Sequence, residues 1–370
     1  MNQVEVAIIG AGMAGLTCAQ VLQQAGYEVV VLEKSRGVGG RLATRRSHGT
    51  RIDHGTCYLS PKAELFQNFI TDLVQLGLVH VWTNCVHTLF PDGSLQPSSE
   101  QIPRYVAADG MSAIAKVLTP GLDIRFNQRV VGLATTSSQT WQLTVDDTTP
   151  DNTATASNLL EAQAVVVTVP APQALDLLAP LEGTALSEQF IRQLQTVEFA
   201  PCIAVMAGYP ADCLQKWQAA YADVKAIGSQ QHPLAWIGLD SSKRRSASQP
   251  VFVIQSTADF AQPLLNATDL IPVGRSLLQA AADLLAPWLA TPDWLQVHRW
   301  RYAFASSPLR EKYLTANSLT PLVCAGDWCG GIRAESAMLS GLEAASYLNQ
   351  KLKNQAIAPT QFWHAIASLK

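Results

Sequence analysis

The chain has 370 residues, of which 48% are hydrophobic, and a formal net charge of −3. This length predicts one large or two medium domains, at about 100–200 residues each, and the apolar content is enough for a sizeable core. No basic run is dense enough to indicate nucleic acid, and no apolar run approaches the ~18 residues of a membrane span. We therefore expect a globular protein that binds neither nucleic acid nor membrane.

The seven cysteines are scattered, and none forms a Cys-x-x-Cys pair. This pattern argues against a zinc ribbon or a redox dithiol, so we expect reduced thiols and no metal. An apolar strand starts at residue 4, where a secreted protein would carry a signal core. These features predict a cytoplasmic protein.

The first 41 residues indicate a strand, a glycine-rich turn and a helix. Residues 4–9 are nearly all apolar, which is typical of a strand buried on both faces. A helical pattern runs from Met13 to Ala25, and a second strand over 28–32 closes on Glu33. This order predicts a Rossmann-like unit that binds a dinucleotide.

The turn holds three glycines with separate expected tasks. Gly10 allows the tight turn, Gly12 lets the backbone approach a pyrophosphate, and Gly15 lets the helix pack closely. Free N–H groups at the helix start would face the phosphates, and Glu33 would accept hydrogen bonds from a ribose. The predicted contacts are Gly10, Ala11, Gly12, Met13, Ala14, Gly15 and Glu33.

A second glycine-rich stretch with two arginines follows over residues 34–41. Guanidinium groups on a flexible backbone would give a second grip on the same pyrophosphate, which favours FAD over NAD. A mobile surface loop is the alternative. The predicted cofactor contacts are Lys34, Arg36, Gly40 and Arg41.

The polar turn at Asp53-His54 is expected to lie beside the flavin ring, with both residues as cofactor contacts. His54 is either a proton donor or acceptor, or a structural hydrogen-bonding group. Tyr58 offers a flat aromatic face and is expected to shape a pocket wall.

Periodicity and turn residues predict the remaining elements. Helices are expected over 65–76, 105–118, 173–178 and 277–289. Strands are expected over 79–89, 123–126, 129–135, 141–145, 164–169, 202–207, 235–239, 251–256 and 322–325. Residues 147–158 should form a variable loop. Residues 181–295 lack the spacing of metal ligands or of a nucleophile, and by elimination they indicate a substrate-facing sheet.

The last predicted strand leads into Gly326-Asp327, and a helix rich in small residues opens near Glu335. Asp327 would hold the ribityl hydroxyls of a flavin, and the helix start would face the N1–O2 edge of the ring. A capped surface turn is the alternative. The predicted contacts here are Gly326, Asp327, Arg333, Glu335, Ser336 and Ala337.

Several motifs together resemble the renalase-like group of the flavin amine oxidase superfamily. They comprise the glycine triplet, residues 33–41, Asp53-x-Gly55-x-x-Tyr58, and residues 109–113, 170–174, 298–303 and 326–335. The resemblance implies noncovalent FAD, with Val130 meeting the adenine through its backbone. It also implies a flavoprotein oxidase that converts 2- and 6-dihydroNAD(P) to NAD(P)+ and reduces O2 to hydrogen peroxide.

The resemblance further implies an α/β fold of the glutathione-reductase and amine-oxidase type. A Rossmann-like FAD-binding domain would comprise residues 1–60, 101–180 and 296–370. An inserted α+β substrate-binding domain of mixed sheet and helices would comprise residues 61–100 and 181–295.

The chain departs from the family pattern at four positions. Cys57 stands where Gln is frequent, Ser336 replaces a frequent Gly, and Gln255 and Phe260 stand where His and Trp are expected. The last two differences, at Gln255 and Phe260, leave the identity of the substrate open more than the fold or the cofactor. The natural isomer is also open. The choice between NAD and NADP forms, the electron acceptor in the cell and the oligomeric state are open as well.

Hydride transfer to a flavin requires a donor that lies flat over the ring with water excluded. This fits a chain without an evident Ser-His-Asp, Cys-His or paired-carboxylate set. The predicted catalytic residues, which form part of the pocket or support it, are Tyr58, His298, Trp300 and Tyr302. Trp300 is either a wall of the pocket or plain core.

Arg299 and Arg301 would either steer a phosphate-bearing substrate or pair with a surface acid. Three other functions stay open. They are oxidation of an amine or another C–H donor, FAD binding without turnover, and an NAD-dependent dehydrogenase.

Overall fold

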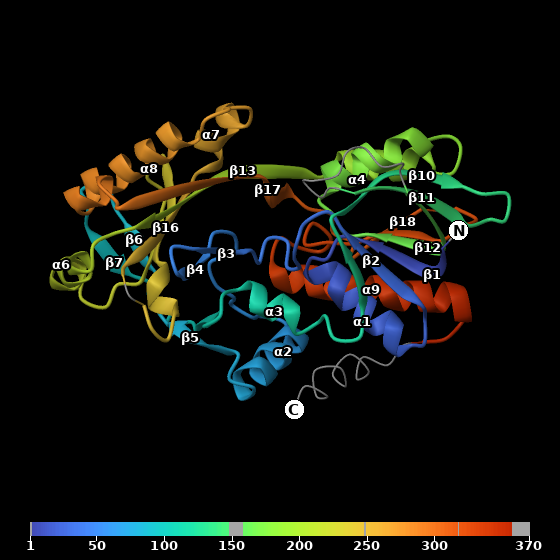
Figure 1. Ribbon diagram of the computed structural model, residues 1–370, viewed down its shortest axis with the longest axis horizontal. Coiled ribbons are helices and arrows are strands. Elements are labelled where there is room, and N and C mark those ends of the chain that lie inside the picture. The colour runs from blue at the N-terminus through green and yellow to red at the C-terminus, as the bar shows by residue number, and fades with distance from the viewer. Residues whose placement is uncertain (1, 148–157, 248, 317, 357–370) are drawn as a thin grey trace. The chain divides into compact units, whose positions relative to one another are not determined.

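The computed structural model describes residues 2–147, 158–247, 249–316 and 318–356 (Figure 1). The chain divides into two compact units, and each has its own sheet and core. The first unit comprises Met1–Gly40, Ala115–Phe199 and Phe304–Lys370, and the second comprises Arg41–Ile114 and Ala200–Ala303.

The α/β fold class is confirmed, because a Rossmann-like unit is joined to a second unit with its own mixed sheet. The boundaries of the compact units differ from the predicted domain boundaries. Residues 41–60, 101–114 and 296–303 lie in the second unit, and residues 181–199 lie in the first. The assignment of FAD and substrate to the two domains stays a prediction.

The first unit is built on an eight-stranded sheet, in which β10, β11, β12, β1, β2 and β9 follow one another and β19 pairs with β12 and β18. Strand β1 pairs in parallel with β2 and β12, as expected for strands buried on both faces. The strands are β1 (Asn2–Ile9), β2 (Val29–Glu33), β9 (Asp123–Phe126), β10 (Gln128–Thr135), β11 (Trp141–Asp147), β12 (Asn158–Val167), β18 (Leu314–Thr315) and β19 (Leu322–Cys324).

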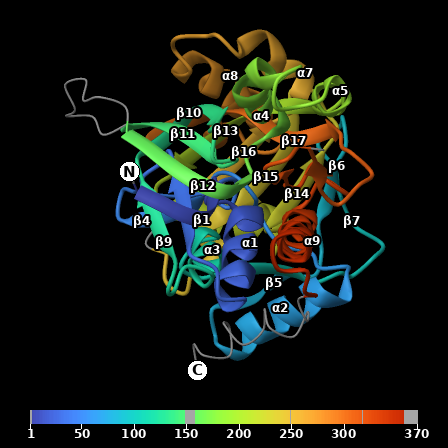
Figure 2. The ribbon, with the colours of Figure 1, turned by 90° about the vertical axis from the view of Figure 1, so that its right-hand side faces the viewer.

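Helices cover both faces of this sheet (Figures 1 and 2). On one face lie α1 (Met13–Gln24) and α9 (Ala334–Lys353), and on the other lie α4 (Ala171–Leu178), η1 (Ala179–Leu181) and α5 (Glu188–Gln195). Helices α1 and α9 pack closely, because a Cβ at Gly341 would lie 2.3 Å from the carbonyl oxygen of Ala14. The small residues predicted for the last helix therefore serve this contact.

The second unit is built on a seven-stranded sheet in the order β17-β13-β16-β15-β14-β6-β7. Its strands are β6 (His87–Leu89), β7 (Leu95–Pro97), β13 (Glu198–Gly208), β14 (Ala226–Ser229), β15 (Leu234–Leu239), β16 (Val251–Ser256) and β17 (Trp294–Ser307). Two small sheets accompany it, one of β3 (Thr44–Ser47) with β4 (Thr50–Asp53) and one of β5 (Val79–Thr83) with β8 (Arg104–Ala107).

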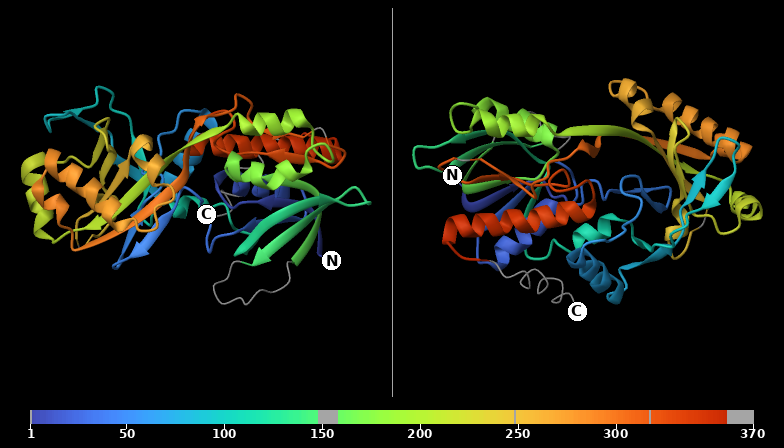
Figure 3. Two further views of the ribbon diagram at one scale, coloured as in Figure 1. Left: turned by 90° about the horizontal axis from the view of Figure 1, so that it is seen from above. Right: turned by 180° about the vertical axis from the view of Figure 1, so that it is seen from behind.

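The main core of the second unit lies on one face of the large sheet. Trp217, Phe252 and Leu277 belong to it, so α6 and α8 pack against the same face of β13, β15 and β16. Figure 3 shows the long α8 along this sheet. The helices are α2 (Glu64–Gln75), α3 (Ser112–Lys116), α6 (Asp212–Tyr221), η2 (Asp240–Lys243), α7 (Ala258–Ala261), η3 (Gln262–Leu264), α8 (Ile271–Leu284) and η4 (Pro287–Ala290).

Most predicted elements are confirmed within a few residues, but the helix expected over 105–118 is wrong. Residues 104–107 form β8, which pairs with β5, and α3 is only five residues long. Long-range pairing overrides the local helical pattern here. The strand expected over 79–89 is two strands in different sheets, and the long β17 was not predicted. Most of the predicted loop over 147–158 lies outside the described residues.

Candidate active site

The glycine-rich turn after β1 has the predicted geometry. Gly10 has a φ of +107°, in a region that favours glycine. A Cβ at Gly15 would lie 2.0 Å from the Gly10 carbonyl oxygen, whereas one at Gly12 would meet nothing within 4 Å. The Thr168 hydroxyl donates to the carbonyl of Gly10 at 3.0 Å and holds the turn. Gly12 therefore leaves space for a ligand, and Gly15 serves close packing.

The start of α1 is buried and lacks a side-chain cap. Its N-cap residue is Gly12, and Met13 and Ala14 in its first turn are less than 5% exposed. The first N–H groups of a helix have no partner inside the helix, and burial makes an unpaired one costly. A phosphate at this end would satisfy them and would also interact favourably with the helix dipole.

Glu33 lies at the end of β2 and is 8% exposed. One carboxylate oxygen accepts from the Ala11 N–H and the other from the Ser35 N–H, both at 2.8 Å. Glu33 therefore holds the phosphate turn, and each oxygen keeps a further lone pair for a ribose hydroxyl.

The second glycine-rich stretch returns to this turn. The Gly39 N–H donates to the Ala11 carbonyl at 2.9 Å, and a Cβ at Gly40 would lie 3.6 Å from the Cα of Gly12. Lys34 and Arg36 are exposed. Arg41 begins the second unit and donates to the carbonyl of Ala303 at 3.2 Å.

The segment that follows β19 reaches the same sheet edge within the first unit. The Ala325 N–H donates to the Val167 carbonyl at 3.0 Å, so β19 ends level with β12. Next along the chain, the Gly326 N–H donates to the Ser340 hydroxyl at 2.9 Å, and Asp327 is 6% exposed.

Helix α9 starts shortly after this strand end. Its N-cap residue is Arg333, no side chain caps it, and its first turn carries Glu335, Ser336 and Ala337. Val130 lies on β10, beside an irregularity in its pairing with β11. The structure thus brings Asp327 to the sheet edge that also carries the phosphate turn of β1.

The remaining predicted site residues lie in the second unit, on the face of its large sheet opposite α8. His298, Trp300 and Tyr302 alternate along β17, so their side chains share one face. Gln255 alternates with Val253 on β16 and faces the same way. Phe260 instead packs against the main core.

The turn after β4 is fixed by hydrogen bonds within this unit. The Trp300 Nε1–H donates to the His54 carbonyl at 2.8 Å, and the Gln255 amide donates to the Gly55 carbonyl at 2.7 Å. The Thr56 N–H donates to the Arg41 carbonyl at 2.8 Å. A Cβ at Gly55 would lie 2.2 Å from that same oxygen, so only glycine fits the turn.

His54, His298 and Trp300 form a cluster of rings. The His54 ring lies 4.8 Å from His298 and 5.4 Å from Trp300, between ring centroids. Burial, with the charges of His298 and Arg45, lowers the pKa of His54 to about 3. Burial and Arg45 lower the pKa of His298 to about 4. Both imidazoles are therefore neutral at pH 7, and the buried His54 Nδ1 has no hydrogen-bond partner among the described residues.

Asp53 belongs to a buried ionic cluster with Asp240, Lys243 and Arg244. Lys243 Nζ lies 2.6 Å from Asp240 and 3.5 Å from Asp53, and Arg244 lies 2.9 Å from each. Although burial raises the pKa of Asp53, the Lys243 and Arg244 charges outweigh it and lower that pKa. The Asp53 carboxylate is thus bonded within the second unit, and its contact with a cofactor stays a prediction.

The family model described as flavin containing amine oxidoreductase matches residues 77–349, and the NAD(P)-binding Rossmann-like domain model matches residues 8–73. The chain belongs to the flavin containing amine oxidoreductase family. Its cofactor is FAD.

Among relatives, L-amino acid oxidase Cdc18 of Crotalus durissus cumanensis is 44% identical over 69 residues. That match covers 19% of this chain and 14% of the relative. L-amino acid oxidase Lm29 of Lachesis muta is 41% identical over 82 residues, which is 21% of this chain and 16% of the relative. The sequence similarity to these oxidases is therefore confined to a small part of their length.

Two solved structures share the fold. Wild-type putrescine oxidase bound to putrescine has a TM-score of 0.68 at 14% identity, over 94% of this chain and 99% of that chain. A putative protoporphyrinogen oxidase from Exiguobacterium has a TM-score of 0.70 at 12% identity, over 95% and 99%. At such low identity, these likenesses show the fold alone.

The first unit fits the dinucleotide part of FAD. The uncapped, buried start of α1 needs an acceptor, and Gly12 leaves room for the pyrophosphate. Glu33 keeps lone pairs for the ribose. We propose that Asp327 and the first turn of α9 meet the ribityl chain and the ring.

The buried cysteine thiols of each unit favour noncovalent binding of the cofactor. Burial raises the pKa of Cys324 and of Cys329 well above the ordinary thiol value. Burial also raises the pKa of Cys57 and of Cys202 to about 12. Such thiols stay protonated and are poor nucleophiles.

Neither Arg299 nor Arg301 pairs with an acid in the described part of the chain, and the steering of a phosphate-bearing substrate by either stays a prediction. Arg299 donates to the carbonyls of Leu264 and Ala267, and Arg301 donates to that of Leu265. They fasten the end of η3 and the loop that follows it to β17. Sequence reasoning missed this bonding, and also that of Gln255, because both depend on strand pairing between distant segments.

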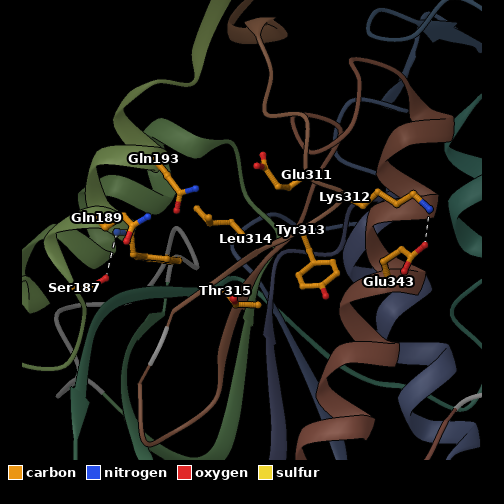
Figure 4. Close-up of a pocket in the computed structure, with 10 residues that line it drawn as sticks. Ser187, Gln189, Gln193, Glu311, Lys312, Tyr313, Leu314, Thr315 and Glu343 are labelled. Atoms are coloured by element: carbon orange, nitrogen blue, oxygen red, sulfur yellow. Dashed lines mark hydrogen bonds and ion pairs between the residues drawn. The ribbon is translucent and has the colours of Figure 1, made fainter.

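The first unit also has a cavity of about 520 Å³ between α5, residues 311–315 and α9 (Figure 4). Gln189 and Gln193 extend toward it from α5, and Lys312 is paired with Glu343 at 2.6 Å. Its lining includes no residue of the phosphate turn and no histidine or cysteine. It is therefore not the predicted active site.

The described residues include no group of three or more His, Cys, Asp or Glu side chains arranged to hold a metal ion. None of their helices is long and apolar enough to cross a membrane.

Proposed function

We propose that this protein is a renalase-like oxidase of isomeric dihydronicotinamides. The 2- or 6-dihydro form of NAD(P) would lose a hydride and become NAD(P)+. O2 would take up that hydride equivalent and one further proton to give hydrogen peroxide. Bound FAD would supply the chemistry, by accepting the hydride and returning the electrons to O2.

The observation that carries this proposal is the charge around the ring cluster. Burial is the main cause of the lowered pKa of His54 and His298, and the positive charge of Arg45 lowers both further. A positive potential disfavours a protonated amine and favours a donor that carries phosphates. Dihydronicotinamides also need no deprotonation before hydride loss, so neutral imidazoles and aromatic rings suffice.

We assign the donor to the second unit and FAD to the predicted contacts described above. Tyr58, His298, Trp300 and Tyr302 would bind and orient the nicotinamide and exclude water. Trp300 and Gln255 also hold the backbone of the turn at His54. Rigid support of this kind matters because hydride transfer is sensitive to small changes in geometry.

Anaerobic stopped-flow reduction tests the proposal. The holoenzyme should bleach rapidly with 2- or 6-dihydroNAD(P) and slowly or not at all with amines. Under air, each turnover should consume one O2 and produce one hydrogen peroxide. A holoenzyme that none of these isomers bleaches would contradict the proposal.

Amine oxidation is the second candidate, since the chain belongs to the amine oxidoreductase family. Rapid bleaching by an amine or an amino acid, with no response to dihydronicotinamides, would establish it. A yellow protein that no donor of either class reduces would indicate FAD binding without turnover.

A further inference from the structure

Arg104 and Tyr58 are held side by side by the backbone of the second unit. Leu59 and Tyr105 exchange two main-chain hydrogen bonds of 2.8 Å, which places the flanking Tyr58 and Arg104 on one side of this pairing. The guanidinium carbon of Arg104 lies 5.2 Å from the centroid of the Tyr58 ring. Both side chains are half-buried.

The guanidinium of Arg104 is only partly bonded. One terminal nitrogen donates to the Ile102 carbonyl at 2.8 Å. The Nε atom is buried and has no partner among the described residues. None of those residues offers Arg104 a carboxylate within ion-pair distance. A half-buried cation without an anion is costly, and such a site gains from an anionic ligand.

The neighbouring cations differ from Arg104 in this respect. Lys243 Nζ lies 5.1 Å from the ring centroid of Trp82, but the acids Asp53 and Asp240 neutralise it. Arg244 pairs with the same two acids. Of these three cations, Arg104 alone lacks an acidic partner in the described part of the chain.

A row of aromatic rings leads away from Arg104. Tyr58 lies 5.4 Å from Trp236, and Trp236 lies 6.4 Å from Trp82, between ring centroids. Trp236 and Trp82 are buried and support the half-buried ring of Tyr58 from behind. The face of Tyr58 suits a planar group, and the guanidinium beside it suits an anion. The combination matches a ligand in which a flat ring and an anionic group are linked.

We propose that Arg104 is a specificity-determining residue that binds a phosphate group of the hydride donor. Tyr58 and Ile102 hold the guanidinium so that its unbonded N–H groups form charge-assisted hydrogen bonds with phosphate oxygens. This inference rests on the proposed function for the identity of the donor, but the binding of the phosphate is testable without turnover.

The test is calorimetric titration of the oxidised holoenzyme with nicotinamide mononucleotide and with nicotinamide riboside, which lacks the phosphate. We expect R104Q to bind the mononucleotide about 10- to 100-fold more weakly, as for the loss of a hydrogen bond to a charged group. Its affinity for the riboside should be unchanged, and R104K should recover part of the loss. The control R275Q removes an equal charge from an exposed position on α8 and should bind both ligands like the wild type.

In turnover, the R104Q defect should appear as a raised KM for phosphate-bearing dihydronicotinamides rather than as a lowered kcat. Equal loss of both titrated ligands, or no loss of either, would overturn the assignment. So would weakened binding of nicotinate, a carboxylate, with unchanged binding of the mononucleotide. If no dihydronicotinamide reduces the wild type, the proposed function fails while the titration still tests Arg104.

Discussion

The substitution Gln255→Glu tests whether the turn at His54 is supported as the structure indicates. The Gln255 Nε2 donates to the Gly55 carbonyl at 2.7 Å and lies 3.5 Å from the His54 carbonyl. An ionised carboxylate of the same shape has no hydrogen to donate and would place its oxygens against those carbonyls. The turn would then lose one of its side-chain supports, with Trp300 as the other.

The expected magnitude follows from the lost bond. Leaving a half-buried carbonyl without its donor costs about 1–3 kcal/mol, and repulsion adds to this. At about 2–4 °C per kcal/mol for a unit of this size, we expect the unfolding temperature at pH 8 to fall by about 2–12 °C.

The loss should depend on pH. A protonated carboxyl again donates one hydrogen bond, so the folded state raises the pKa of the new carboxyl above its unfolded value. The stability of the variant should therefore recover as pH falls through that raised pKa toward the ordinary value of about 4.3. Wild-type Gln255 does not ionise and contributes no such change.

Thermal unfolding of the holoenzyme at pH 8 and pH 5 measures this effect as the difference between wild type and variant at each pH. The control Q218E introduces the same charge at an exposed position on α6 and should change stability little at either pH. The rate of flavin reduction by the Gln255→Glu variant should recover with stability at low pH. A loss of equal size at both pH values, or no loss, would refute the reasoning.

Three further predictions concern other parts of the structure. Gly15→Ala should abolish FAD retention, because its Cβ would lie 2.0 Å from the Gly10 carbonyl oxygen. The control Gly37→Ala should retain FAD, because its Cβ meets nothing within 4 Å. The visible absorbance of the purified variants measures the retained flavin. Lys243→Met should lower the free energy of unfolding by about 3–5 kcal/mol, because it leaves two buried acids with one cation. Denaturant unfolding measures this loss, and an unchanged unfolding midpoint would contradict the prediction. The His54 imidazole should not titrate by NMR between pH 8 and pH 5. Because the unfolded chain binds a proton near pH 6.5, this residue's contribution to stability should be lost as pH falls below that value.

The sequence by itself determined the dinucleotide-binding part of this protein. The glycine spacing after β1, the helix that follows and Glu33 at the end of β2 lie within 33 residues. Their geometry depends on backbone freedom and on local hydrogen bonds, which a short stretch of sequence encodes almost completely. The confirmed fold class and cofactor follow from this stretch and from the motifs near the end of the chain.

Only the tertiary structure decided the arrangement of the second unit. The sequence pattern at 105–118 favours a helix, yet β8 forms there because β5 and Leu59 supply its hydrogen bonds. That pairing brings Arg104 to Tyr58, and the pairing of β15 and β16 brings Trp236 and Gln255 to one sheet face. Contacts between residues far apart in the sequence depend on strand register, which local propensity does not specify.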